Sequence, residues 1–178
     1  EPVSLAEARQ HLRVDTDAED ALVSALIASA RTHVESITGR ALITQGWRLY
    51  RDEWPTAGVV RLAPSPVASV DAVTVYDADG MPSVISPSGY AVDLAGAPGR
   101  LRLLATTGGL RAVNGIEIDI TCGYGATGAD VPAPLRQAIL MLVAFWFEQR
   151  EAAAFEAIAP RVSHGVWSLA APYRVAKL

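Results

Sequence analysis

Residues capable of catalysis or metal binding are present, but their spacing does not fit such a role. The three histidines, His11, His33 and His164, do not have the spacing of metal ligands. His33 and Glu35 fall on different faces of a predicted helix and would chelate poorly. Ser163 and His164 are adjacent, whereas a hydrolase triad brings three groups together in space, and no G-x-S-x-G motif occurs. We expect no metal site and keep a small hydrolase using Ser163 and His164 as an alternative.

Three further patterns are explained by turns or by the core. Asp77-Ala78-Asp79-Gly80 resembles the start of a calcium loop but lacks the later acidic ligand, so it predicts a hairpin turn. Gly108-Gly109 and Gly123-Tyr124-Gly125 match neither a phosphate-binding loop nor a dinucleotide fingerprint. Cys122, the single cysteine, ends a predicted strand and is expected in the core. We therefore predict no catalytic residue, no cofactor and no enzymatic activity.

The composition predicts a folded protein without general affinity for nucleic acid. The chain has 178 residues, of which 51% are hydrophobic and 19% charged, enough for a sizeable core. Its net charge of −4 argues against a protein that grips phosphate backbones. The longest apolar run, residues 138–147, is about half of the roughly 20 residues needed to span a bilayer. With no leader after Glu1, we expect a soluble protein made in the cytoplasm.

Helices are predicted near the N-terminus. Ser4-Leu5-Ala6-Glu7 forms a capping box for a helix over about residues 5–12. A longer helix begins near residue 20 and ends at Gly39, a residue typical of helix C-termini. Its apolar stripe is predicted to consist of Leu22, Leu26, Ala30, Val34 and Ile37.

The last long helix is apolar on nearly all sides. Pro132 and Pro134 open it, and we expect it to reach about Ala154. Because such a helix must be covered all round, it is interpreted as the core helix, covered by its own subunit, by another subunit, or by both. One face of it is formed by Leu135, Ile139, Leu142, Val143 and Trp146.

Between these helical parts the pattern changes to strands and turns. Ile116, Ile118 and Ile120 alternate with polar residues, which predicts a strand with one wet face. The predicted fold is α+β: a helical body with an inserted small antiparallel β subdomain and an extended C-terminal tail. The predicted segments are the N-terminal helices (1–40), the β-rich insert (41–130), the core helix (131–155) and a docking tail (156–178).

The tail is too apolar for a disordered end. Pro160, Gly165 and Pro172 are expected to prevent a single helix through it. Aromatic residues and arginine are typical of interface anchors, so we expect the tail to dock on a partner surface. A tail that folds back onto its own subunit is the alternative. The predicted contact residues are Pro160, Trp167, Leu169, Pro172, Tyr173, Arg174 and Val175.

Several short motifs follow one another in a characteristic order along most of the chain. They are Leu5-Ala6-Glu7-Ala8, Asp20-Ala21-Leu22, Thr38-Gly39-Arg40-Ala41-Leu42, Leu62-Ala63-Pro64-Ser65-Pro66-Val67, Tyr76-Asp77-Ala78-Asp79-Gly80, Cys122-Gly123-Tyr124-Gly125, Leu135-Arg136-Gln137-Ala138-Ile139, Trp146-Phe147-Glu148-Gln149-Arg150-Glu151 and Leu169-Ala170-Ala171-Pro172-Tyr173-Arg174. No single motif is specific, but their order and spacing together resemble the head–tail connector, or adaptor, proteins of long-tailed phages and gene transfer agents. One departure is that Trp146-Phe147-Glu148-Gln149-Arg150-Glu151 replaces the usual aromatic-Tyr-Glu-Asn-Arg-Glu.

The resemblance implies a structural protein without a catalytic site. It implies a dodecameric ring in the neck of a phage or phage-like particle, assembled in the bacterial cytoplasm. Such a ring joins the portal of the DNA-filled head to the stopper and tail, and DNA passes through its channel without specific binding and without any membrane. The alternatives are another neck protein, either a stopper or a tail terminator, and a regulatory binding module. A stopper would be mostly β, and no basic recognition helix supports a module that binds nucleic acid.

Overall fold

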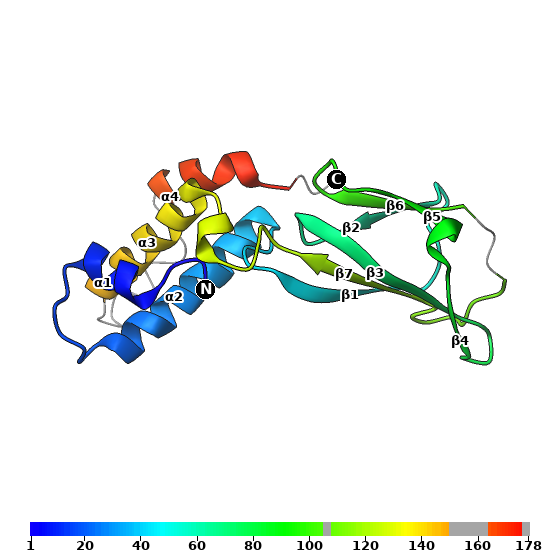
Figure 1. The fold of residues 1–178 in the computed structure, drawn as a ribbon, viewed down its shortest axis with the longest axis horizontal. Coiled ribbons are helices and arrows are strands. Elements are labelled where there is room, and N and C mark those ends of the chain that lie inside the picture. Colours follow the sequence, from blue (N-terminus) through cyan, green and yellow to red (C-terminus); the bar gives the residue numbers. More distant parts are fainter. Residues whose placement is uncertain (105–107, 150–163, 176–178) are drawn as a thin grey trace. The chain divides into compact units, whose positions relative to one another are not determined.

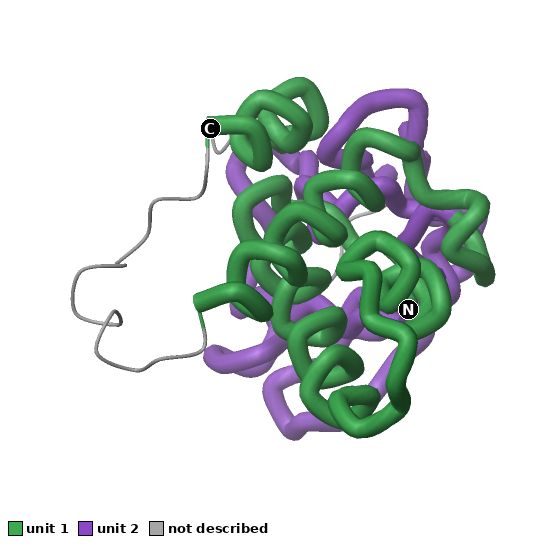
Figure 2. Tube along the Cα trace, turned by 90° about the vertical axis from the view of Figure 1, so that its left-hand side faces the viewer, with its two compact units in different colours: residues 1–43, 125–178 green, residues 44–124 purple. Residues whose placement is uncertain are grey.

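The computed structural model describes residues 1–104, 108–149 and 164–175, which form helices and two antiparallel sheets (Figure 1). The predicted α+β class is confirmed. The chain divides into two compact units, which are coloured separately in Figure 2. Residues 1–43 together with 125–178 form the first, here called the helical unit, and residues 44–124 form the second, the β unit.

The helical unit begins with two helices whose ends are fixed by local sequence. In the capping box of α1 (Leu5–Leu12), Ser4 Oγ accepts a hydrogen bond from the Glu7 amide at 3.2 Å. The Glu7 carboxylate accepts one from the Ser4 amide at 2.9 Å. Helix α2 (Asp20–Thr38) ends at Gly39, whose φ of 69° is costly for residues with a Cβ. Both predicted boundary signals are therefore confirmed.

The buried stripe of α2 differs from the predicted one. Val23, Ile27, Ala30, Val34 and Thr38 are buried, whereas Leu22 is 39% exposed. At 3.6 residues per turn, three successive steps of four rotate a stripe by about 120° around the helix. The steps of four, three and four from Val23 to Val34 rotate it by only about 20°, so these residues stay on one face. The prediction that placed Leu22 on the buried stripe was wrong for this reason.

The rest of the helical unit consists of α3 (Ala133–Glu148), α4 (His164–Ala170) and two short 3₁₀ turns, η2 (Gly128–Asp130) and η4 (Ala171–Tyr173). Pro132 and Pro134 lie at the start of α3, as predicted, while its predicted end near Ala154 lies outside the described residues. Residues 164–170 form one and a half to two helical turns. Gly165 is therefore accommodated inside a helix, and within residues 164–175 this helix gives way to η4, which contains Pro172. No helix in the described parts of the chain is long and apolar enough to cross a membrane.

The β unit contains two antiparallel sheets. Its strands are β1 (Gln45–Arg51), β2 (Val59–Leu62), β3 (Val67–Tyr76), β4 (Pro82–Val84), β5 (Tyr90–Asp93), β6 (Gly99–Leu103) and β7 (Ile116–Cys122), with the 3₁₀ turn η1 (Pro87–Gly89) before β5. The four-stranded sheet has the order β1-β7-β3-β4, and the three-stranded sheet has the order β2-β6-β5.

The two sheets of the β unit lie one above the other (Figure 1) and share an apolar core. From the four-stranded sheet, Ile116 and Ile118 are fully buried. From the three-stranded sheet, Leu62 and Leu101 are fully buried as well. Because side chains alternate along a strand, the polar residues between them lie on the two outer faces of the unit.

Candidate assembly surface

Helix α3 is the centre of the helical unit and contacts α1, α2 and α4. Leu135 and Ile139 are fully buried, and Leu142 is 4% exposed. Trp146, near the end of the helix, is only half-buried. The chain itself therefore covers most of α3 and leaves the aromatic end of the helix partly open.

A hollow of about 570 Å³ lies beside Trp146 on the helical unit. The ring of His33 on α2 meets the indole edge to face, with centroids 6.1 Å apart and an interplanar angle of 84°. Small side chains of α2 form the remainder of the lining, so the hollow is shallow and could receive a side chain of a partner. Its lining residues are Ala28, Ser29, Thr32, His33, Ser36 and Trp146.

The C-terminal tail is anchored by residues that the sequence analysis did not select. Val166 and Ala170 are 1% and 0% exposed, and α4 contacts both α3 and α2. Their spacing of four places them on the same face of α4. Trp167, which was predicted as a contact residue, lies beside this anchor and is 40% exposed. In the sequence, the spacing of four between Val166 and Ala170 indicates this buried face of α4.

Beyond α4 the chain is tied to the C-terminal end of α2. The Val175 amide donates a hydrogen bond to the Thr38 carbonyl at 2.8 Å. The Arg40 guanidinium donates through Nε to the Tyr173 carbonyl. These bonds satisfy carbonyl groups that would otherwise lack helical partners. Residues 164–175 therefore fold onto their own subunit, which was the alternative arrangement considered from the sequence.

This anchoring leaves one side of the tail facing away from the helices. The Arg174 guanidinium lies 4.7 Å from the centre of the Trp167 ring, a cation–π contact worth about 0.5–1 kcal/mol at an exposed site. Pro172 is exposed and Leu169 is half-buried. We call Trp167, Leu169, Pro172 and Arg174 the outer tail face. Pro160, predicted to belong to the same surface, lies outside the described residues.

The N-terminus is held to α3 by a second set of long-range contacts. Arg136 donates to the Pro2 carbonyl at 3.1 Å and forms an ion pair with Glu7. Gly128 approaches the same segment so closely that an added Cβ would lie 2.4 Å from the Pro2 carbonyl oxygen. The pKa of Glu7 lies below its usual range, first because the Ser4 amide and hydroxyl bond its carboxylate and then because Arg136 is near. Neither Arg136 nor Arg40 was predicted as a contact residue.

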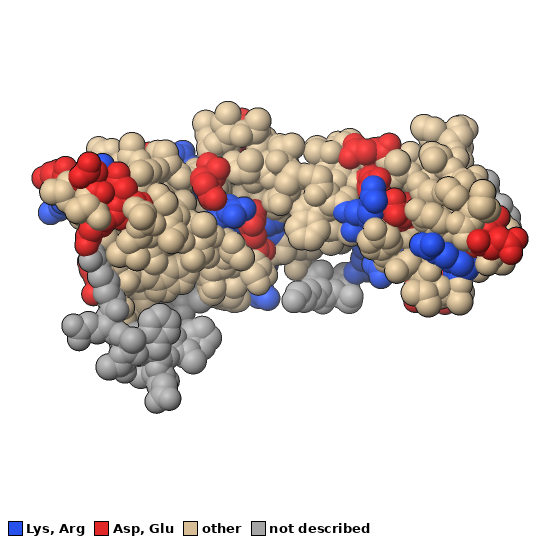
Figure 3. Space-filling view, turned by 90° about the horizontal axis from the view of Figure 1, so that it is seen from below, with Lys and Arg blue, Asp and Glu red and all other residues tan. Residues whose placement is uncertain are grey.

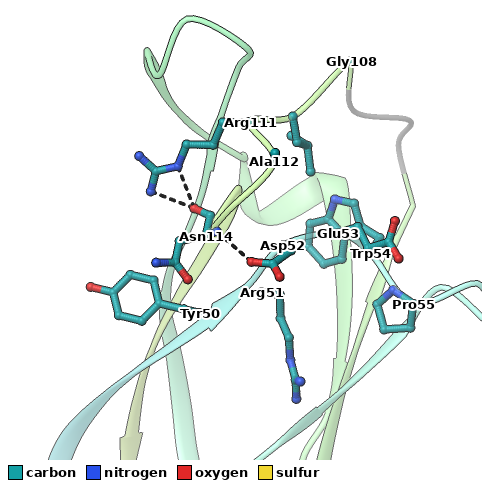
Figure 4. Close-up of a pocket in the computed structure, with 11 residues that line it drawn as sticks. Tyr50, Arg51, Asp52, Glu53, Trp54, Pro55, Gly108, Arg111, Ala112 and Asn114 are labelled. Carbon is teal, nitrogen blue, oxygen red and sulfur yellow. Dashed lines mark hydrogen bonds between the residues drawn. The ribbon is translucent and has the colours of Figure 1, made fainter.

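A hollow on the β unit is lined by polar residues, several of which bond one another (Figure 4). Its volume is about 940 Å³, and hydrogen bonds join Asp52, Arg111 and Asn114 in its wall. Asp52 Oδ1 accepts a hydrogen bond from the Asn114 amide at 2.8 Å, and Arg111 donates to the Asn114 carbonyl at 2.7 and 2.9 Å. Arg111 also lies 3.9 Å from the centre of the Tyr76 ring. These contacts hold residues 111–114, which precede β7.

The other residues considered for chemistry have structural surroundings. Cys122 is buried, and burial raises the pKa of its thiol to about 11, which opposes thiolate formation. Asp77 Oδ1 accepts hydrogen bonds from the Asp79 and Met81 amides at 3.0 and 2.9 Å, as in a turn. His164 is exposed at the start of α4, and Ser163 lies outside the described residues. Within the described ranges, no three His, Cys, Asp or Glu side chains are placed to hold a metal ion.

The fold as a whole is that of neck proteins from gene transfer agent (GTA) particles. One similar chain comes from the neck of an empty GTA particle computed with C6 symmetry; it is 31% identical, the match covers 99% of this chain and 91% of that one, and the TM-score is 0.80. A chain from the virion of a native GTA particle has the same identity and coverage and a TM-score of 0.83. A third, from the neck of a native GTA particle computed with C12 symmetry, is 30% identical over 98% of this chain and 89% of that one, with a TM-score of 0.76.

Residues 2–90 match the family described as phage gp6-like head-tail connector protein. The chain belongs to this family, and the family resemblance predicted from the sequence is confirmed. It is a structural protein of the junction between the head and the tail of a phage-like particle. No curated protein matches the sequence.

Proposed function

We propose that this chain is the adaptor that forms a ring between the portal and the stopper or tail of a phage-like particle. The observation that carries the proposal is the likeness, over 98–99% of the chain, to chains of GTA necks. Two of those necks were computed with C6 and C12 symmetry, and identical subunits around such an axis form a ring. The channel of the ring would let DNA pass.

The charge of the chain supports passage of DNA rather than binding. The chain has 19 acidic residues against 15 lysines and arginines. Tight binding to phosphates needs a surplus of clustered cations, which displace counterions from the DNA. A channel built from subunits with a net negative charge repels the backbone on average and does not hold it.

The outer tail face is the part of the helical unit that we assign to the portal or to a neighbouring subunit. It joins exposed aromatic, proline and arginine side chains on a segment whose backbone is already fixed by Val166, Ala170 and Thr38. A surface that is ordered before binding loses less entropy on association than a free tail. The hollow beside Trp146 lies on the same unit and is a second place for a partner's side chain.

Two other functions fit the fold less well. A stopper or a tail terminator would share the neck, but the helices at both ends of the chain favour the adaptor. A hydrolase would need a third group that orients His164 beside Ser163, whereas His164 is exposed at the start of α4.

Electron microscopy of the full chain, alone and mixed with the portal protein of the same particle, tests the proposal. We expect rings that stack coaxially on the portal. A chain that stays monomeric and shows no affinity for the portal would contradict the adaptor function.

The contribution of the outer tail face is tested with the double variant Trp167→Ala and Arg174→Ala. It leaves the buried anchor residues in place, and we expect portal binding or ring formation to fall at least about tenfold. The matched control is Trp47→Ala with Arg51→Ala, which removes an exposed tryptophan and an exposed arginine from the β unit. Equal binding by both variants would exclude the outer tail face.

A further inference from the structure

The outer face of the three-stranded sheet of the β unit is rich in arginine. Arg61 on β2 and both Arg100 and Arg102 on β6 point to this side, and all three are exposed. Asp93 is the one acidic residue within β2, β5 and β6, which are described in full. We call this surface the arginine face.

The strand register places like charges next to each other on the arginine face. Arg61 lies directly opposite Arg100 in the β2–β6 pair, and Arg102 follows on the same face of β6. Asp93 on β5 pairs with Arg100 and so neutralises one of the three. Like charges directly opposite each other destabilise a sheet. An isolated subunit therefore keeps a repulsion that an acidic partner surface would relieve.

The arginine face is also hollowed. A recess of about 290 Å³ has both apolar and charged walls, a combination typical of the parts of an interface that receive a partner's side chain. Its lining residues are Val59, Ala91, Val92, Asp93, Arg100 and Arg102.

The outer face of the four-stranded sheet carries the opposite charge. Asp119 and the nearly buried Glu117 lie beside Arg48, which bonds Asp119 at 2.7 and 3.0 Å and lies 3.2 Å from Glu117. Asp71 lies on the same face and bonds Thr121 of β7. Asp71 is exposed and accepts hydrogen bonds from the hydroxyl groups of Ser69 at 2.6 Å and Thr121 at 2.8 Å. We call this surface the acidic face. Figure 3 views this side of the β unit, where acidic and basic side chains lie side by side.

Arg111 adds a positive charge at one end of the acidic face. Its guanidinium is stacked on Tyr76 and donates both bonds to the Asn114 carbonyl. Tyr76 in turn donates from its hydroxyl to Glu117 at 3.2 Å. Three carboxylates against Arg48 and Arg111 leave the face with an excess of negative charge. That excess lies at Asp71, whose hydrogen bonds come from neutral hydroxyl groups.

We propose that the arginine face of one subunit binds the acidic face of the next copy of this chain. The inference rests on the proposed ring and adds the surface that would close it. Because the two faces lie on opposite sides of one pair of sheets, they form a head-to-tail contact, the kind of interface that generates rings. Complementary charge would fix the register between subunits and speed their association.

DNA phosphate is the competing occupant of the arginine face. Three arginines with an aspartate among them are few for phosphate binding, and the whole chain has a net charge of −4. The acidic face supplies a complement on every copy. A second copy is therefore the better match to the arginine face.

Two charge-reversed forms of the full chain test the contact. The first, Arg61→Glu with Arg102→Glu, reverses the arginine face and leaves the Arg100–Asp93 pair intact. The second, Asp71→Lys with Asp119→Lys, reverses the acidic face, and Asp71→Lys alone is the milder form if the double variant is unstable. The control is Arg51→Glu, an exposed position in the same unit that belongs to neither face. Circular dichroism confirms that each variant is folded.

Ring formation on the portal of the same particle is then measured by electron microscopy at about 0.1 M salt, where charges interact over about 10 Å. We expect each reversed form alone to form at least about tenfold fewer rings than the wild type. An equal mixture of the two forms should restore ring formation, because opposite charges then meet at every contact between alternating subunits. Wild-type ring formation should weaken as salt is raised, and the control should match the wild type.

Unchanged rings from either folded, reversed form would overturn the assigned contact while leaving the adaptor function intact. Intact rings with weaker binding of a short DNA duplex by the first form would place the arginine face on DNA and also overturn it. If the wild-type chain forms no ring with the portal, the adaptor function itself fails, and the contact fails with it.

Discussion

The helical unit and the β unit use their charged and polar side chains in opposite ways. In the helical unit, Arg136 and Arg40 bind backbone carbonyls far away in the sequence and hold both ends of the chain to the helices. In the β unit, Arg61 and Arg102 lie exposed on an outer face. Arg136 and Arg40 thus hold their own chain together, whereas we propose that Arg61 and Arg102 bind a second copy. The comparison indicates that a connector can separate the surface that orders the chain from the surface that joins the copies.

The largest expected effect on stability comes from removing a buried side chain from the core of each unit. Ile139→Ala in the helical unit and Ile118→Ala in the β unit both remove a fully buried side chain. Each should lower the free energy of unfolding by about 2–5 kcal/mol because lost burial and a cavity add together. Hydrogen exchange should locate each loss mainly in the unit that carries the substitution. Equal loss of protection in both units would show that they unfold together and would weaken the distinction between them.

A smaller effect is expected where the N-terminal segment meets η2. Gly128→Ala would place a methyl group 2.4 Å from the Pro2 carbonyl oxygen, so the segment must shift. We expect a loss of about 1–3 kcal/mol in the free energy of unfolding, as for other overpacked sites. The control is Gly46→Ala on β1, where an added Cβ meets nothing within 4 Å. Thermal unfolding measures both, and equal stabilities of the two variants would contradict the close approach.

A still smaller effect is expected from removing a hydrogen bond between the tail and the end of α2. Arg40→Ala removes the side chain that donates to the Tyr173 carbonyl, and one such bond contributes about 1 kcal/mol, or somewhat more when charged. We expect faster amide exchange at Val175, whose amide donates to Thr38, with little change in α1. Arg51→Ala should leave this exchange unaltered. Unchanged protection of Val175 in the Arg40 variant would refute the tie.

The smallest expected effect is a difference in salt dependence between the pKa values of Glu7 and Asp93, which are both lowered. Hydrogen bonds from Ser4 are the main cause for Glu7, whereas a bond from the exposed Arg100 is the main cause for Asp93. Salt weakens the attraction between exposed charged groups, such as Arg100 and Asp93, but acts little on hydrogen bonds from the neutral groups of Ser4. In an NMR titration, raising the salt concentration should therefore move the Asp93 pKa toward its usual range and leave that of Glu7 nearly unchanged. Equal shifts would contradict these causes.

The lowered pKa of Glu7 makes its contribution to the free energy of unfolding depend on pH. A carboxyl group with a lower pKa in the folded state stabilises the fold at pH values above its unfolded pKa. That stabilisation is lost as the pH falls through the folded pKa. Glu7→Gln should therefore reduce the dependence of stability on pH on the acid side and leave its dependence near neutral pH unchanged. Urea unfolding at several pH values measures this.

Local sequence predicted those parts of the fold that depend on neighbouring residues. The capping box at Ser4, the end of α2 at Gly39 and the alternation through Ile118 each involve residues a few positions apart. The contacts of Arg136 with Pro2 and of Arg40 with Tyr173 join residues more than 130 positions apart, and no local pattern indicates them. The wrong stripe on α2 arose because apolar residues occupy two adjacent rows of that helix, and only packing selects between them.

The candidate surfaces were predictable to different degrees. The order of motifs identified the family, and the composition of the tail drew attention to Trp167 and Arg174. Their contact, and the anchoring of the tail by Val166, depend on the helical form of residues 164–170. The arginine and acidic faces could not be predicted, because they depend on which strands pair in which sheet and in what register.

The central claim is that this chain forms a ring on a portal, and counting its copies there tests that claim most directly. Native mass spectrometry of the full chain with the portal of the same particle gives the number of copies per complex. We predict twelve, the number set by C12 symmetry in a similar neck with one copy per repeat. A portal that carries no copies, or a variable number of independently bound ones, would contradict the claim.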